Sequence, residues 1–180
     1  MDLPSNFRMM ALYNQRMNNQ LMDVCESLTD EQLHAETHSF FSSVMSYWNH
    51  ILFGDLIMLR RLIDNNIAQI EPVLLSQLPV ATAVNETFVS NLKELKSLRQ
   101  LVDSIYVEFT KSLHPNTCRQ VVRYTTTEGG VLERNVAEFC QHIFNHQTHH
   151  RGQLTCVLSQ FGLDFGCTDL PVIVHEGARS

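Results

Sequence analysis

Histidines are the residues of this sequence whose spacing most suggests chemistry. Four of the nine histidines fall close together, at His142, His146, His149 and His150. On an α-helix, at about 100° per residue, all four lie on one face about 100° wide. Two histidines four residues apart have Cβ atoms about 5–6 Å apart, so both imidazoles can bind one divalent metal ion. The stretch offers two such pairs, His142–His146 and His146–His150, and spacing alone does not choose between them.

A catalytic metal site needs three protein ligands and an open position, so a third ligand must come from elsewhere in the chain. His50 is the candidate, and it lies in the apolar run Trp48–Phe53. A histidine in such a run can be an ordinary core side chain. If it faces the histidine pair across a helical bundle, a ligand role is favoured, because bundle metal sites are built from inward side chains on facing helices.

The histidine cluster also has a simpler interpretation, which is a solvated polar helix face. Glu138, Gln141 and Asn145 indicate that the same helix has a hydrated side. The residues on either side of His146 are Asn145 and Gln147, so the glutamate of an HExxH motif is missing here. The general base of that metalloprotease motif is therefore absent, which disfavours a hydrolase without excluding one.

Long helices are needed to bring these histidines together, and the composition favours them. The 180 residues include only 7 glycines and 5 prolines, so few turns are expected. Apolar residues recur at helical steps, or lie all round the axis, in four segments. We expect helices at about residues 5–25, 42–63, 85–113 and 135–161.

The connections between these helices complete the expected fold. Residues 64–83 form a long crossover, and residues 119–133 form a short β-hairpin before the last helix. Ser42 or Ser43 is the expected N-cap of the second helix. The sequence therefore predicts an all-α protein, a four-helix bundle with a long crossover connection, in a single domain spanning residues 1–180.

Composition excludes several classes of protein. The net charge is −6, from 13 Lys and Arg against 19 Asp and Glu, which argues against a dedicated nucleic-acid binder. No apolar run approaches the roughly 20 residues of a membrane span, and no secretion signal is visible. The five cysteines form no CxxC pair, as expected of scattered thiols in a reducing compartment. We therefore expect a cytoplasmic protein with no nucleic-acid or membrane partner.

Three stretches of the sequence carry a family resemblance. Residues 7–19 contain the aromatic-Asn step Tyr13-Asn14, and His50–Asp55 is an HxxxxD element. Residues 145–153 join an HxxxH pair to an Arg-Gly-Gln step. Together they resemble the DinB/YfiT-like superfamily, and most closely its DinB (damage-inducible) branch, over nearly the whole chain.

The resemblance implies a metal site and its ligands. In this family one histidine of the second helix and the HxxxH pair of the last helix hold a divalent metal ion, which implies His50, His146 and His150. It favours the second histidine pair over the first, and it leaves His142 and His149 as neighbours without an assigned role. Zinc and nickel are both associated with related proteins, so we expect one ion of either kind.

The other residues of these motifs have separate expected roles. We expect Asp55 and Arg151 to make structural pairs within the bundle, and Gly152 to permit close helix packing. Gln153 is expected to hydrogen-bond a ligand histidine or a metal-bound water.

The resemblance also suggests a reaction. The superfamily includes transferases and isomerases that use low-molecular-weight thiols, so a metal-dependent thiol S-transferase activity on a small-molecule substrate is the first hypothesis. A non-catalytic metal-stabilised stress-response or interaction module and a metal-dependent hydrolase are the alternatives. Family members often pair, and Met9, Met10, Met17 and Met22 place apolar residues on more than one side of the first helix, so a homodimer is expected.

Overall fold

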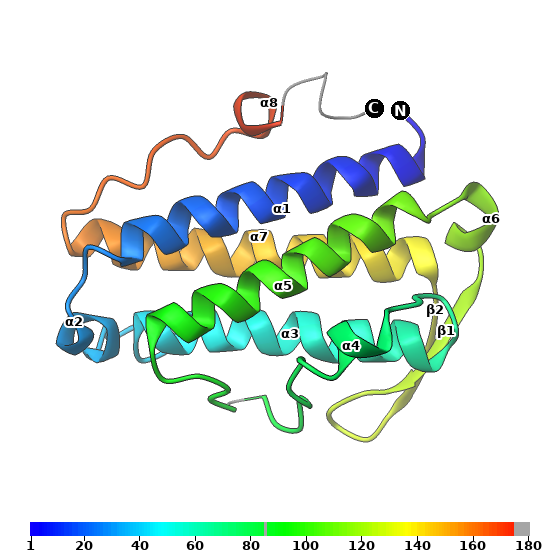
Figure 1. Cartoon of the computed structure of the whole chain (residues 1–180), viewed down its shortest axis with the longest axis horizontal. Helices are drawn as coiled ribbons and strands as arrows, with labels where there is room; N and C mark the ends of the chain where they lie inside the picture. The colour runs from blue at the N-terminus through cyan, green and yellow to red at the C-terminus, as the bar shows by residue number, and fades with distance from the viewer. Residues whose placement is uncertain (85, 175–180) are drawn as a thin grey trace.

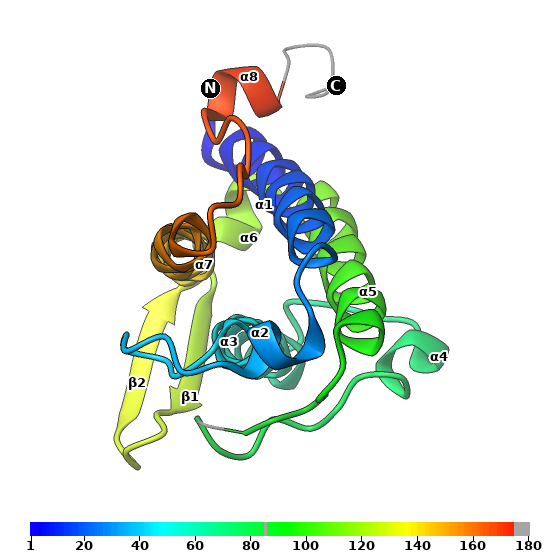
Figure 2. The same ribbon diagram turned by 90° about the vertical axis from the view of Figure 1, so that its left-hand side faces the viewer.

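Four long helices form the body of the protein (Figure 1). The computed structural model describes residues 1–84 and 86–174. The long helices are α1 (Leu3–Cys25), α3 (Val44–Asp64), α5 (Leu92–Lys111) and α7 (Val136–Gln160). Viewed end-on they follow the order α1, α5, α3, α7 around the bundle, and helices next to each other in this order are in contact (Figure 2). The predicted all-α four-helix bundle is confirmed, and the two helices that carry the candidate ligands are antiparallel neighbours.

Shorter elements lie at the ends and along the sides of the bundle. The short helices are α2 (Asp30–His34), α4 (Pro72–Leu75), α6 (Pro115–Cys118) and α8 (Leu170–Ile173). The strands β1 (Val121–Thr125) and β2 (Val131–Asn135) pair antiparallel, with Val121 opposite Asn135 and Thr125 opposite Val131. The predicted hairpin before the last long helix is therefore confirmed, and it packs against α3 and α7.

Side-chain caps set where the two histidine-bearing helices begin. Ser43, one of the two expected residues, is the N-cap of α3, and its Oγ accepts the backbone N–H of Ser46 at 3.1 Å. Asn135 caps α7 in a reciprocal capping box with Glu138. Each cap satisfies backbone N–H groups that the start of a helix leaves without a partner. The cap therefore fixes the first turn, and with it the position of every later residue along the helix axis.

The predicted start of the third long helix is wrong. It was expected near residue 85, which lies outside the described residues, but α5 begins at Leu92 after the N-cap Asn91. Before it, Asn49 of α3 binds the chain: its Oδ1 accepts the N–H of Phe88 at 2.8 Å, and its Nδ2 donates to the carbonyl of Val89 at 3.0 Å. These long-range hydrogen bonds compete with helical ones, so the crossover is longer than expected and contains α4.

The methionines of α1 lie mainly in the core of this one chain. Met9, Met17 and Met22 are buried and Met10 is half-buried. These side chains therefore give no support to a second copy of the chain, and the homodimer stays a prediction. Among the described residues, no helix combines the length and apolar character that crossing a membrane requires.

Candidate metal centre

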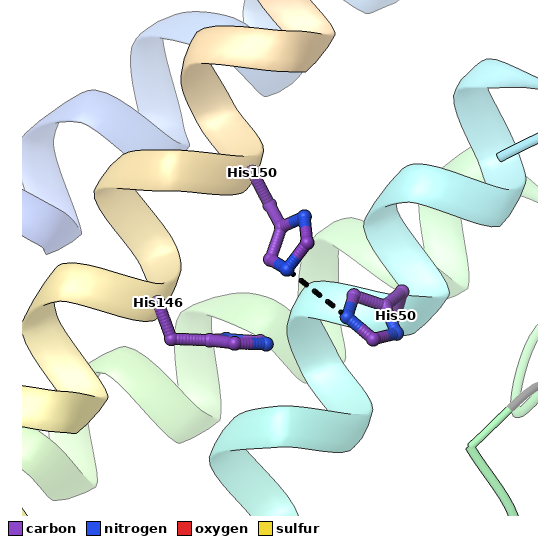
Figure 3. Close-up of side chains that lie close together, drawn as sticks. All are labelled: His50, His146 and His150. Atoms are coloured by element: carbon purple, nitrogen blue, oxygen red, sulfur yellow. Dashed lines mark hydrogen bonds between the residues drawn. The ribbon is translucent and has the colours of Figure 1, made fainter. Parts of the chain in front are cut away.

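Three partly buried imidazoles meet between two neighbouring helices, α3 and α7. His50 projects from α3, and His146 and His150 project from α7 toward it (Figure 3). One ring nitrogen of each lies within 4.8 Å of the others, and the Nε2 atoms of His50 and His150 are 3.1 Å apart. The structure therefore places together the three residues that the resemblance implied.

The hydrogen bonds of His150 set which of its nitrogens is free. Its Nδ1 is 2.8 Å from the Oε1 of Gln153, one turn further along α7. An amide oxygen only accepts, so Nδ1 carries the proton and Nε2 of the neutral ring keeps a lone pair aimed at His50. Gln153 therefore makes a hydrogen bond to a candidate ligand histidine, which is one of the two roles expected of it.

Burial keeps the three rings uncharged. Burial and the neighbouring His150 and His50 lower the pKa of His146 to about 3. Burial, followed by the proximity of His150, lowers the pKa of His50 to about 4. Burial also lowers the pKa of His150. Neutral imidazole is the form that binds a divalent ion, so the rings are ready as ligands at neutral pH.

Gly54, which the sequence analysis did not single out, makes room for His146. A Cβ built on Gly54 would lie 2.4 Å from Cε1 of His146 and 2.8 Å from its Nδ1. A glycine inside a long helix of a glycine-poor chain was the available signal. Gly152 was expected to have such a packing role, and this prediction is wrong: it is exposed, and a Cβ there would meet nothing within 4 Å.

An aromatic wall and a cleft border the cluster. The ring of Phe41 lies 4.2 Å from that of His50 and 5.6 Å from that of His150, between centroids. A cleft of about 220 Å³ is lined by His50, His146, α3, α7 and the hairpin. Another cavity also borders His50, but His146 is not part of its wall. The first of these two cavities therefore reaches candidate ligands on both helices.

Comparison with known proteins identifies the family. A sequence profile described as the DinB family matches residues 3–177. The chain belongs to the DinB family. It is 25% identical over 157 residues to the protein named DinB of Bacillus subtilis (strain 168), covering 87% of each chain. Its fold is similar to the crystal structure of a DinB-like protein from Bacillus cereus ATCC 10987, with a TM-score of 0.55 and 18% identity over 86% of this chain and 90% of that one.

The remaining histidines of α7 lie outside the three-histidine cluster of this DinB-family chain. His142 is exposed, its ring centroid is 6.0 Å from that of His146, and it lines the cleft. His149 is also exposed, with its ring centroid 4.8 Å from that of His150. Within the described part of the chain, the three inward histidines are the one group of histidine, cysteine or acidic residues with metal-site spacing.

A buried polar network underlies the DinB motifs around the cluster. Asp55 accepts hydrogen bonds from Arg99 of α5 and, at 2.8 Å, from Gln147 of α7. Arg99 also pairs with Asp103 at 2.9 Å, and both side chains are buried. The structural pairing expected of Asp55 is confirmed by this contact with Arg99 across the bundle.

Arg151 joins the same network from α7 toward α1. Its guanidinium donates to Oε1 of Gln147 and Oδ1 of Asn14, both at 2.7 Å, and to Asn18 at 3.3 Å. Asn18 in turn donates to Asp103 and to Gln147. Arg151 is therefore structural, as expected, although its closest partners are amides rather than a carboxylate. Two aspartates and two arginines balance in charge, and the network joins all four long helices.

The donor set of this DinB site fits a divalent ion. Because His150 Nδ1 donates to Gln153, the short contact between His50 and His150 requires a proton on the Nε2 of His50. A cation among the three rings would take the place of that proton. Imidazole nitrogen suits zinc, nickel and related ions, whereas magnesium and calcium prefer oxygen ligands. The cluster could therefore bind a transition-metal ion.

Proposed function

We propose that this chain is an enzyme that binds one divalent ion, zinc or nickel, through His50, His146 and His150 and transfers a low-molecular-weight thiol to an electrophile. The observation that supports this is the convergence of three neutral imidazoles beside an open cleft. Three protein ligands leave a coordination position for a substrate. A divalent ion there supplies the positive charge that keeps a thiol ligand deprotonated near neutral pH.

The protein's own groups would bind and orient the reactants. Gln153 fixes the ring of His150, and Phe41 covers His50 and His150 and limits the access of water. In the described residues, the cleft wall includes a single acidic residue, Asp55, whose carboxylate is buried and held by Arg99 and Gln147. A thiol reaction needs less of a general base than attack by water does, which favours thiol transfer over hydrolysis.

A non-catalytic role has one specific observation in its favour. Gln147 and Arg151, which flank the ligand positions on α7, belong to the buried network that joins the four helices. An ion that links α3 to α7 at this point would stabilise the bundle without any turnover. This alternative is a metal-stabilised interaction module.

Reconstitution with metal and an assay of activity separate the two roles. Metal-stripped protein is loaded with zinc or nickel and mixed with a panel of small thiols and an alkylating electrophile. We expect thioether formation by the loaded protein and none by the stripped protein or by His146→Ala. A higher melting temperature on loading with no turnover of any thiol would instead support the module.

The setting of the enzyme is part of the proposal. We place it in the cytoplasm as a homodimer acting on a small molecule, without nucleic-acid or membrane partners. The net charge of −6 supports the absence of a nucleic-acid partner, because nucleic acids bind to positively charged surfaces. Size-exclusion chromatography with light scattering tests the dimer, and a mass near the 20.7 kDa of one chain would contradict it.

A further inference from the structure

The cleft beside the three histidines has a cationic end. Its wall includes Gly54 and His146 near the cluster, and Arg61 and His142 further along α3 and α7. Arg61 lies seven positions after Gly54 on α3, which is about 10 Å at about 1.5 Å per residue. Because α3 and α7 are antiparallel, the step from His146 to His142 runs in the same direction along the cleft.

Contacts with the hairpin and with α3 hold the guanidinium of Arg61 at that end. Its Nη2 donates to the carbonyl of Thr125 at 2.9 Å, and its Nη1 lies 3.3 Å from the sulfur of Met58. Its central carbon lies 4.4 Å from the centroid of the Tyr124 ring. These contacts leave about three of its five N–H groups without a partner among the described residues. The Nε, which has no such partner, is not sealed from solvent.

The charge of Arg61 has no carboxylate partner among residues 1–84 and 86–174. The adjacent Arg60, by contrast, pairs with Asp64 at 2.9 Å. Asp55, the acidic residue of the cleft wall, is taken up by the buried network and is 1% exposed. A half-buried guanidinium with free donors and no counter-ion is suited to bind an anion that enters the cleft.

The rest of the lining favours a small and mainly apolar molecule between the two ends. Phe53, Ile57 and Ile143 are apolar, and Thr126 and Thr127 of the hairpin turn can offer hydroxyl groups. The cleft volume of about 220 Å³ is enough for a molecule of several carbon atoms. A cationic ligand would be repelled by the guanidinium of Arg61.

We propose that Arg61 binds the carboxylate of the substrate, so that the cleft takes a small thiol whose sulfur meets the three histidines and whose far end is anionic. This inference rests on the proposed function for the identity of the sulfur end. The carboxylate end depends only on Arg61 and the cleft. A planar carboxylate can accept two parallel N–H bonds from a guanidinium, which a neutral hydroxyl group cannot do.

The test compares two thiols of equal length in cobalt-loaded protein, followed by the sulfur-to-cobalt absorption band. Wild type should bind mercaptohexanoate about tenfold or more tightly than mercaptohexanol, as expected for hydrogen bonds between charged groups. Arg61→Gln should lose this preference while its affinity for mercaptohexanol is unchanged. Arg61→Lys, which keeps the charge, should keep part of the preference, and Arg60→Gln, the matched control, should keep all of it.

Equal affinities for the two thiols in wild type, or a preference that survives in Arg61→Gln, would overturn the inference. An experiment without metal tests the inference about Arg61 separately from the proposed function. Metal-free protein is titrated with hexanoate, and the amide resonances of Thr126 and Thr127 are followed by NMR. We expect saturable shifts in wild type and none in Arg61→Gln, and no shift in wild type would count against the site. Failure of cobalt to bind would overturn the metal proposal. The hexanoate titration would then decide by itself whether Arg61 binds a carboxylate.

Discussion

The imidazole of His146 occupies the space that a side chain at Gly54 would fill. The virtual Cβ of Gly54 lies 2.4 Å from Cε1 of His146, closer than real carbon atoms approach. Glycine also costs a helix interior roughly 0.5–1 kcal/mol relative to alanine. Gly54 therefore weakens α3 but allows the ring of His146, a candidate ligand, to approach this helix closely.

Gly54→Ala should displace the His146 ring and weaken metal binding by at least about tenfold, a loss comparable to that from disturbing a ligand's support. Gly152→Ala is the matched control, because it changes an exposed glycine of α7 that has nothing within 4 Å of its Cβ. Competition with a chelator measures both affinities. Similar metal affinity in Gly54→Ala and wild type would contradict the close approach.

Gln153→Ala should lower metal affinity about tenfold, because the Nδ1–H of His150 loses the oxygen that orients it. The helix should remain stable, since the side chain is only partly buried. Gln141→Ala, at an exposed position of the same helix, is the control and should leave the affinity unchanged. An isothermal zinc titration provides the measurement, and an equal effect in both variants would refute a specific role for Gln153.

Arg99→Met should lower the free energy of unfolding by about 3–5 kcal/mol, because Asp55 and Asp103 would remain buried without their cation. Lys96→Met on the same helix removes a cation that also faces two carboxylates, Asp23 and Glu26, but these are exposed. That control should cost about 1 kcal/mol or less. Urea unfolding followed by circular dichroism compares the two variants.

Acid should destabilise the metal-free protein through its buried histidines. The folded-state pKa values of His146 and His50, at about 3 and about 4, lie below the value of 6.5 for a free histidine. Between pH 6.5 and 4 the unfolded chain therefore binds more protons, so stability is present above that window and falls as the pH drops through it.

The variant His146→Gln isolates this contribution. Its urea midpoint should fall less steeply with decreasing pH than that of wild type, because one group that gains a proton on unfolding has been removed. His149→Gln, at an exposed position, serves as the control and should follow wild type. Parallel pH profiles for wild type and His146→Gln would show that the ring is not held neutral by burial.

The helices and the histidine face were predictable because their signals are periodic and local. The N-cap at Ser43, the hairpin and the four long helices follow from residues close to one another in the sequence. The start of α5 was not predictable, because Asn49 holds residues about forty positions away through its amide. The candidate site likewise has features that follow from local spacing and features that depend on long-range contacts.

Local spacing indicated that His146 and His150 share a face, and the resemblance selected this pair over the one with His142. The roles of Gly54, Phe41 and Arg61 depend on which helix or loop lies opposite, and no local pattern contains that information. Long-range packing therefore decides the walls of the site, whereas periodicity together with the family resemblance indicates its candidate ligands.

The metal content of the purified protein tests the central claim most directly. Elemental analysis should find about one zinc or nickel ion per chain in wild type, as three histidine ligands require. It should find almost none in the variant with alanine at His50, His146 and His150, while His142→Ala should keep its metal. Equal metal content in wild type and in the triple variant would contradict the three-histidine site.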